Sequence, residues 1–514
     1  METESQSPKR RARGRAARIL RRRGGLSVAA PFIQRRIPTY ALHDEEALDR
    51  LEDQAEWVLQ EVGLNILGDP EALSLLADAG ATVDGTQVRF PRGLARQLCQ
   101  TAPAQFLWHG RDAAKVAQVG GDGVVFGPVF GPPYVTDLDR GRRSGDLAAF
   151  TDFAKLTQAS PFLHFSLPSI VEPNDLPLNK RHLDMMERLY QIGDKPCFGV
   201  SSAPERAVDS IEMARLVFGT DFVADNVVTG GNLNVNSPLT IDHITTGVMK
   251  TYARAGQFTM LAPFMMAGAM APVTMAAAIA QHHAECMAGI ALNQLYQPGA
   301  PIVYGNWLTT MDLKTGAPTF GTPEAILAAY AIGQLSRRLG VPLRAGGTYT
   351  GSKIADGQAM REGGDMLTAS VFSGSHMTIA AAGWLEGGLT AGYEKFVMDL
   401  DIVGAMSRQM RGLSLDEEQL GRDAYAEAAA GENFLATGHT RKHFEAANYE
   451  YALSDHGPFE HWKEAGSLDI QARANRSWKK ILEEFEPPSF DPGIAEALAD
   501  YVTRRKLAMP DEWY

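Results

Sequence analysis

Aromatic and amide side chains recur at the ends of short apolar runs in this sequence. With one acid among them, they are Phe126, Tyr134, His164, Asn232, Asn234, Phe264, Asn306, Trp307, Tyr349, Trp384 and Glu386. Ring faces attract a poorly hydrated cation such as a quaternary ammonium, and one carboxylate can balance its charge. No obvious nucleophile stands beside a base in this set. The pattern therefore predicts a site that binds a cationic ligand and works by orienting it.

Each of these side chains has an expected role. Glu386 is predicted to face the ammonium, with Tyr349 beside it at the catalytic centre. The walls of the cage are predicted to come from Phe126, Tyr134, Phe264, Trp307 and Trp384. If the ligand also carries a carboxylate, its donors are expected to be His164, Asn232, Asn234 and Asn306. Any single aromatic could instead be a layer of the protein core, and that alternative stays open.

The elements that position these residues follow a strict alternation. Short apolar runs, each followed by a helix-like stretch, span residues 123–127, 162–170, 197–201, 226–232, 258–264, 302–306, 343–347 and 377–382. Strand and helix repeated eight times is typical of the α/β class and its TIM (β/α)8 barrel. In that architecture the active site lies at the carboxyl ends of the strands, which is where the aromatic and amide residues fall. The fold alone does not determine the chemistry.

Four regions are expected along the chain. Residues 1–40 form a basic, mobile N-terminal arm, and residues 41–118 a small α/β cap. Residues 119–412 form the barrel, and residues 413–514 a C-terminal helical region rich in Ala, Glu and Arg. The arm could be only a solvated tail, or it could contact an acidic partner protein or a neighbouring subunit.

Composition narrows the class of protein. The chain has 514 residues, 45% of them hydrophobic, and a net charge of -12, so it can bury a large core and is a poor match for nucleic acid. Its 3 cysteines are widely spaced, which favours a cytoplasmic location over a disulfide framework. The uncharged stretch 258–280 is interrupted by Pro263, Gly268 and Pro272, so we expect no membrane span. Extra terminal segments on a barrel favour a homo-oligomer.

Familiar cofactor motifs are absent. The sequence has no phosphate loop, no dinucleotide fingerprint and no clustered Cys-x-x-Cys. His282 and His283 are neighbours on a predicted helix, where they point in different directions and are poorly placed to bind one ion. We therefore expect no metal site.

Several stretches in order resemble the trimethylamine methyltransferase (MttB) family. They are Gly230–Leu239, Pro298–Gly305, Gly346–Gly347 with Ser352–Lys353–Ile354 and Asp356–Ala359, and Ala382–Gly388. The resemblance covers nearly the whole chain, the basic arm included. It implies a TIM-barrel methyltransferase that passes a methyl group from an amine to the Co(I) of a separate corrinoid protein.

The substrate implied by this resemblance is a quaternary amine. Founding members carry pyrrolysine near the seventh strand, and this chain has ordinary residues in the corresponding neighbourhood of Gly347–Tyr349. It is thus similar to the glycine betaine methyltransferases of the family. A quaternary nitrogen leaves as a neutral amine without an acid, which fits the residues present. Two alternatives stay open: direct transfer to tetrahydrofolate, and a non-catalytic binder of a methylated amine.

Overall fold

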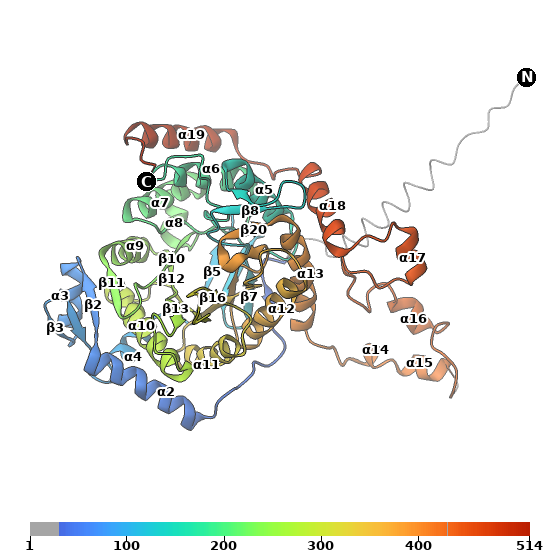
Figure 1. The fold of residues 1–514 in the computed structure, drawn as a ribbon, viewed down its shortest axis with the longest axis horizontal. Helices are drawn as coiled ribbons and strands as arrows, with labels where there is room; N and C mark the ends of the chain where they lie inside the picture. The colour runs from blue at the N-terminus through green and yellow to red at the C-terminus, as the bar shows by residue number, and fades with distance from the viewer. Residues whose placement is uncertain (1–29, 429, 514) are drawn as a thin grey trace, which may run out of the picture.

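The computed structural model describes residues 30–428 and 430–513. Most of the predicted basic arm therefore lies outside the described residues. The centre of the molecule is a curled sheet of parallel strands wrapped by helices (Figure 1). The parallel strands, in spatial order, are β10 (Gly230–Leu233), β12 (Phe258–Leu261), β14 (Ile302–Gly305), β17 (Leu343–Gly346), β18 (Met377–Ile379) and β7 (Gly123–Phe126). Six of the eight predicted runs thus contain a strand.

The other two predicted runs are extended segments rather than regular strands. Residues 162–167 follow β7, where the His164 N–H donates to the Phe126 carbonyl at 2.8 Å. The Phe126 N–H in turn donates to His164 Nδ1 at 3.0 Å, so a side chain replaces a ladder hydrogen bond. Residues 197–200 follow next: Phe198 N–H donates to the Ser166 carbonyl, and Gly199 N–H to the Gly230 carbonyl of β10. Both segments therefore link the two ends of the parallel sheet.

The sheet continues beyond β7 through antiparallel strands, β6 (Val116–Gly120), β5 (Gln105–His109) and β1 (Ile33–Gln34). Trp108 on β5 packs against the rings of Phe165, Phe198 and Phe258 with centroids 5.0 to 5.3 Å apart. These rings fill the inside of the curled sheet near the amino ends of its strands. The core at that end is closed by aromatic packing.

Strand register decides which side chains point inward. The side chains of Thr259 and Tyr304 form hydrogen bonds with α10, which lies outside the sheet. Because side chains alternate along a strand, the residues next to Thr259 and Tyr304 point inward. The register pairs Asn232 with the inward Met260, and Arg344 with Gly305 next to Tyr304. Asn232 and Arg344 are therefore directed into the curled sheet.

The helices around the sheet are α5 (Leu147–Ala159), α6 (Arg181–Ile192), α7 (Pro204–Phe218), α8 (Thr220–Asp225), α9 (His243–Arg254), α10 (Met275–Tyr296), α11 (Pro323–Leu339), α12 (Gly357–Phe372) and α13 (Tyr393–Met410). Several start at side-chain caps that the sequence displays. Asp146, Asp242 and Asp356 each accept a backbone N–H in the first turn of α5, α9 and α12, at 2.7 to 3.0 Å. These caps place the amino ends of the helices beside the carboxyl ends of the strands.

A small α/β layer precedes the central sheet. It contains α2 (Glu45–Trp57), η1 (Val58–Val62), β2 (Leu64–Leu67), α3 (Pro70–Asp78), β3 (Thr82–Asp84), β4 (Gln87–Arg89) and α4 (Leu94–Cys99). Its sheet has the order β11-β2-β4-β3 and takes its edge strand, β11 (Thr240–Asp242), from the loop after β10. That strand ties this layer to the central sheet.

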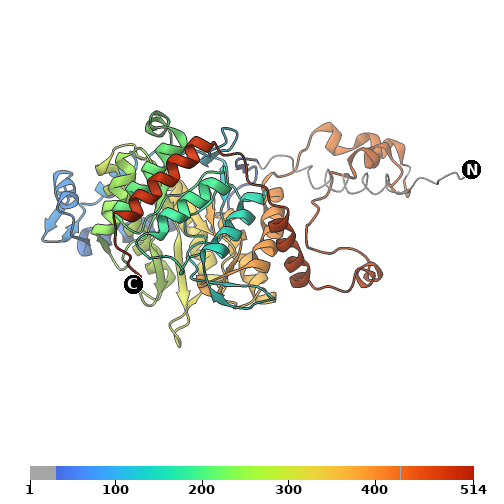
Figure 2. The same cartoon turned by 90° about the horizontal axis from the view of Figure 1, so that it is seen from above.

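The C-terminal part divides into two kinds of helix. Figure 2 shows α18 (Ile470–Glu483) and α19 (Pro492–Leu507) lying on the body, while α14 (Glu417–Leu420), α15 (Arg422–Glu427), α16 (Gly438–His443) and α17 (Phe459–Glu464) stand off from it. Tyr501 and Arg505 of α19 both bond to Asp209 on α7.

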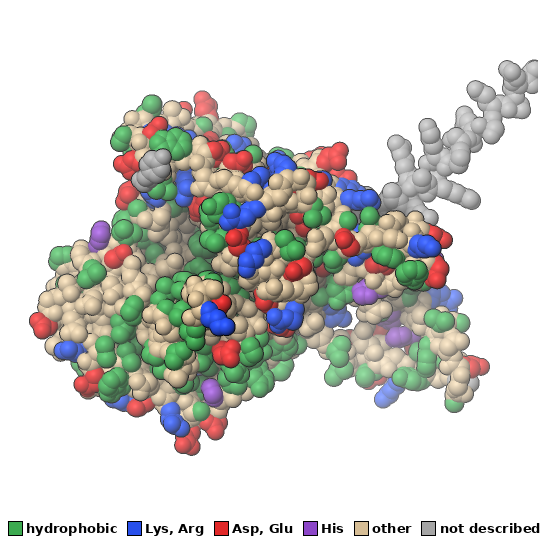
Figure 3. Space-filling model, in the orientation of Figure 1, with side chains coloured by type: hydrophobic (Ala, Val, Ile, Leu, Met, Phe, Trp, Pro, Cys, Tyr) green, Lys and Arg blue, Asp and Glu red, His purple; other side chains and the backbone are tan. Residues whose placement is uncertain are grey.

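The face seen in Figure 3 has acidic and basic side chains interspersed around a region of hydrophobic ones. Within residues 30–428 and 430–513, no helix combines the length and apolar character that a bilayer crossing needs.

Candidate active site

The loops at the carboxyl ends of the parallel strands build two further small sheets. One joins β13 (Phe264–Ala267), β15 (Trp307–Met311) and β16 (Pro318–Thr319). The other joins β19 (Trp384–Leu385), β20 (Thr390–Gly392), β8 (Tyr134–Thr136) and β9 (Arg143–Ser144), with the turn η2 (Glu386–Gly388) between β19 and β20. We call this end of the molecule the mouth. Most of the predicted site residues lie on these loops.

One half of the mouth is built from rings. Tyr349 and Trp384 lie with ring centroids 4.4 Å apart, and Phe320 contacts both, at 5.3 and 5.8 Å. Phe264 and Trp307 form a second contact at 4.9 Å. We call these five residues the aromatic group. Four of them were predicted from the sequence, and the structure brings them together in two contacting sets.

Arg344 connects the two sets of rings. It donates to the Tyr349 hydroxyl and to the Asn306 carbonyl, both at 2.8 Å. Its guanidinium carbon lies 5.4 Å from the centre of the Trp307 ring. The Tyr349 ring covers Gly346, where a Cβ would come within 2.0 Å of the ring. Burial raises the pKa of Tyr349 although Arg344 acts in the opposite direction, so the phenol stays protonated at neutral pH.

Two indole nitrogens in the aromatic group are buried without partners. Trp307 Nε1 and Trp384 Nε1 form no hydrogen bond with any described residue, and the same holds for Arg344 Nε. Unpaired buried donors are uncommon in folded proteins and indicate a ligand or an ordered water. The aromatic group therefore has both ring faces and donors available.

Glu386 is not an isolated carboxylate. It accepts hydrogen bonds from Arg142 Nε at 2.8 Å and from the Thr390 hydroxyl at 2.6 Å. The Arg142 guanidinium lies 3.6 Å from the centre of the Tyr134 ring. Burial opposes the charged form, yet the bonds from Thr390 and Arg142 lower the pKa of Glu386 overall. Its negative charge is thus already balanced by a cation, and Tyr134 faces that cation.

The other half of the mouth is polar and hollow. A cavity of about 410 Å³ opens beyond residues 162–167, residues 197–200 and β10. Asn232 and Asn234 line it together with Arg181, His182 and Arg206. Asn232 Oδ1 is buried and has no partner among the described residues, while the Asn232 N–H donates to Ser201 Oγ at 2.8 Å. Two of the predicted amide donors are therefore at this cavity.

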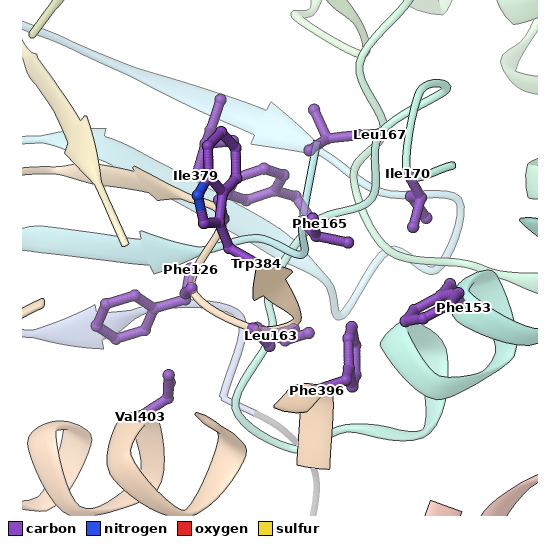
Figure 4. Close-up of a cluster of buried hydrophobic side chains, with 14 of the residues drawn as sticks. Phe126, Phe153, Leu163, Phe165, Leu167, Ile170, Ile379, Trp384, Phe396 and Val403 are labelled. Carbon is purple, nitrogen blue, oxygen red and sulfur yellow. The ribbon is translucent and has the colours of Figure 1, made fainter. Parts of the chain in front are cut away.

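The side chains of three predicted residues are used within the strands rather than facing either half. A Cβ at Gly127 would come within 2.1 Å of Phe165 inside the sheet, so the preceding residue, Phe126, points outward. Figure 4 shows its ring directed toward the side where α13 carries Val403. His164 is buried behind β7, and burial lowers its pKa to about 3. Asn306 uses its side chain to accept the Leu308 N–H. The structure thus gives all three a place in the packing of the strands.

Several residues at the mouth were missed by sequence reasoning. They are Arg142, Arg181, His182, Arg206, Phe320 and Arg344. Arg142 stands in the basic stretch 140–143, which looks like a solvated turn, and Arg344 is a lone charge in an apolar run. Only strand register could have signalled that Arg344 points inward.

No group of metal-binding side chains is found in the part of the chain that the structure describes. His282 Nδ1 and His283 Nδ1 both contact the hydroxyl of Tyr304 at 3.1 to 3.3 Å. Burial lowers the pKa of each to about 3. These neutral histidines pack α10 against β14.

A curled parallel sheet with a cavity at the carboxyl ends of its strands is the arrangement of α/β enzymes. The chain belongs to the trimethylamine methyltransferase (MTTB) family, whose family model matches residues 11–510. Membership of this family makes it a methyltransferase.

Individual relatives agree with this placement. The chain is 33% identical over 477 residues to the glycine betaine methyltransferase of Desulfitobacterium hafniense, covering 93% of this chain and 99% of that protein. It is 29% identical to the trimethylamine methyltransferase MttB2 of Methanosarcina mazei, covering 88% and 93%. Among solved structures, the monomethylamine methyltransferase of Methanosarcina barkeri aligns with a TM-score of 0.44 and 10% identity, covering 88% and 96%.

Proposed function

We propose that this protein removes a methyl group from a quaternary amine of the betaine class, such as glycine betaine, and passes it to the Co(I) of a separate corrinoid protein. The similarity to glycine betaine methyltransferase over 93% of the chain supports the substrate class. The observation that carries the proposal in the structure is the aromatic group at the mouth, because ring faces attract a quaternary ammonium.

The reaction needs little acid–base chemistry from the protein. The bond between nitrogen and methyl breaks, its electron pair stays on nitrogen, and the methyl group bonds to cobalt, whose electron pair forms the new bond. The amine leaves neutral, so no proton moves. The protein must hold the methyl group in line with the incoming cobalt and keep water away. Here the corrinoid is a second substrate, presented at the mouth by its own protein.

The aromatic group and its neighbours take the following roles in this proposal. The ring faces of Tyr349 and Trp384 contact the ammonium, and Phe264 and Trp307 close the other side. Glu386 adds negative charge at the rim, weakened by its pair with Arg142. Tyr134 holds Arg142 in place, and Asn232 and Asn234 face the polar end of the substrate.

We also infer the architecture around this site. The hydrogen bonds through residues 162–167 and 197–200 support a complete (β/α)8 barrel. We assign the barrel to residues 119–412, the cap to 41–118, the basic arm to 1–40 and the C-terminal helical region to 413–514. We further propose a cytoplasmic homo-oligomer that meets its corrinoid protein at the mouth.

The test is methyl transfer to free Co(I) cobalamin from a panel of amines. The panel contains glycine betaine, proline betaine, carnitine, choline and trimethylamine. We expect methylcobalamin from at least one quaternary amine, with the demethylated product detected by mass, and no transfer from trimethylamine. Transfer to tetrahydrofolate with none to cobalt, or binding without transfer to either acceptor, would overturn the proposal.

A further inference from the structure

The polar cavity lies where two helices begin. Arg181 is the first residue of α6, and Arg206 lies in the first turn of α7. Both line the cavity. Backbone N–H groups at the amino end of a helix favour an anion. The position alone does not define a ligand, so the side chains must be considered next.

The charged side chains of the cavity leave one cation unpaired. Arg181 pairs with Glu172 at 2.5 Å, and burial raises the pKa of Glu172 although Arg181 opposes this. Arg206 donates to the hydroxyl of Ser202 at 2.9 Å. Among residues 30–428 and 430–513 it forms no ion pair with a carboxylate. Within the described residues, the cavity therefore has a half-buried arginine that no carboxylate pairs directly, although Glu205, Glu512 and Glu172 lie near enough to act on its charge.

His182 provides an independent sign of a ligand. Its Nε2 lies 2.9 Å from Asp209 Oδ2, so the proton on Nε2 points at that carboxylate. Its Nδ1 is buried and has no partner among the described residues, although the side chain is only 3% exposed and lines the cavity. Because Nε2 uses its proton on Asp209, Nδ1 donates to a carboxylate only when the ring carries a proton on both nitrogens.

The C-terminus of the chain holds this wall in place. Tyr501 and Arg505 each donate to Asp209 Oδ1 at 2.6 Å. The last residues also hold the loop before α6, where the Leu178 N–H donates to the Glu512 carbonyl at 2.7 Å. Leu178 itself lines the cavity. The walls of the cavity are thus positioned by residues 292 or more positions away along the chain.

We infer that this cavity is a carboxylate subsite, in which Arg206 and His182 bind the carboxylate of a betaine substrate. The inference rests on the proposed function and makes it more specific. Of a zwitterionic substrate, this cavity would hold the carboxylate. Amines without a carboxylate, such as choline, would lose this contact.

The experiment is calorimetric binding of glycine betaine and of tetramethylammonium, which has the cation but no carboxylate. The proteins are the full chain, Arg206→Gln, His182→Gln and the control Arg215→Gln, which changes a partly exposed arginine further along α7. Glycine betaine should bind about tenfold more weakly to the first two variants and equally to the control. Tetramethylammonium should bind all four proteins alike.

Three outcomes would overturn the subsite. Glycine betaine could bind Arg206→Gln and His182→Gln as tightly as the full chain. The binding of both ligands could weaken together in these variants although circular dichroism shows that the variants are folded. The full chain could demethylate choline and none of the betaines. A failure of the proposed function is distinct, because it would appear as no transfer to Co(I) from any amine.

Discussion

The two halves of the mouth satisfy their polar groups in different ways. In the aromatic half, rings pack on one another and two indole donors have no partner in the described part of the chain. In the polar half, Asp209 is bonded by groups from α6 and α19, and Glu172 is paired with Arg181. The first half offers surface to a ligand whose charge is diffuse. The second holds fixed charges for a ligand whose charge is localised.

Under the proposed function, the two halves suit the two opposite charges of a zwitterionic substrate. A quaternary ammonium has no N–H, so ring faces bind it without hydrogen bonds. A carboxylate needs donors that are already oriented, because orienting them on binding would cost entropy. The rings come from loops that directly follow the strands, while the oriented donors depend on contacts with the end of the chain.

The largest expected effect is in the aromatic half. Trp384 is 3% exposed and contacts Tyr349 and Phe320. Trp384→Ala should lower the free energy of unfolding by about 3–5 kcal/mol, because it removes a large buried ring. It should also weaken tetramethylammonium binding. Urea denaturation and calorimetry measure the two effects.

A matched control is Trp57→Ala, since Trp57 is 49% exposed. This change should alter the free energy of unfolding by about 0.5 kcal/mol or less. If Trp384→Ala weakened the binding of glycine betaine but left the binding of tetramethylammonium unchanged, the aromatic half would not be the ammonium site.

The polar half should respond to acid through Asp209. Burial opposes its charged form, but hydrogen bonds from His182, Arg505 and Tyr501 lower the pKa of Asp209 to about 2. The ordinary value is about 3.9, so the bonds stabilise the fold above about pH 4. That contribution, about 2 kcal/mol, is lost as the pH falls from 4 toward 2.

Urea denaturation of the full chain and of Asp209→Asn across this pH range measures the contribution. The difference between the two proteins should be full at pH 7 and shrink below pH 4. An exposed control, Asp78→Asn, should differ little from the full chain at any of these pH values. A constant difference between pH 7 and pH 2 would contradict the role of Asp209.

The smallest expected effect is at the rim. Arg142 and Glu386 have side chains 45% and 22% exposed, and such pairs contribute about 1 kcal/mol or less. Glu386→Gln should raise the KM of all quaternary amines about threefold, whether or not they carry a carboxylate. A rise of hundredfold would show that Glu386 faces the ammonium without screening by Arg142.

The sequence predicted much of the central sheet and part of the site. Six apolar runs became strands because their residues were apolar over a strand length between turn residues. The run 162–170 did not, because His164 accepts the Phe126 N–H that a ladder would use. In the loop after β17, Asp356 caps α12, and Glu362 accepts from Thr350 Oγ1 and the Gly351 N–H.

The sequence by itself determined most strands of the central sheet and that aromatic residues gather at their carboxyl ends, because period and turn chemistry are local properties. Only the tertiary structure decided that Phe126 points outward and Arg344 inward, since a shift of one residue in register exchanges the two faces. It also decided the polar half, because Asp209 and Arg505 are 296 residues apart and meet only when α19 packs on α7.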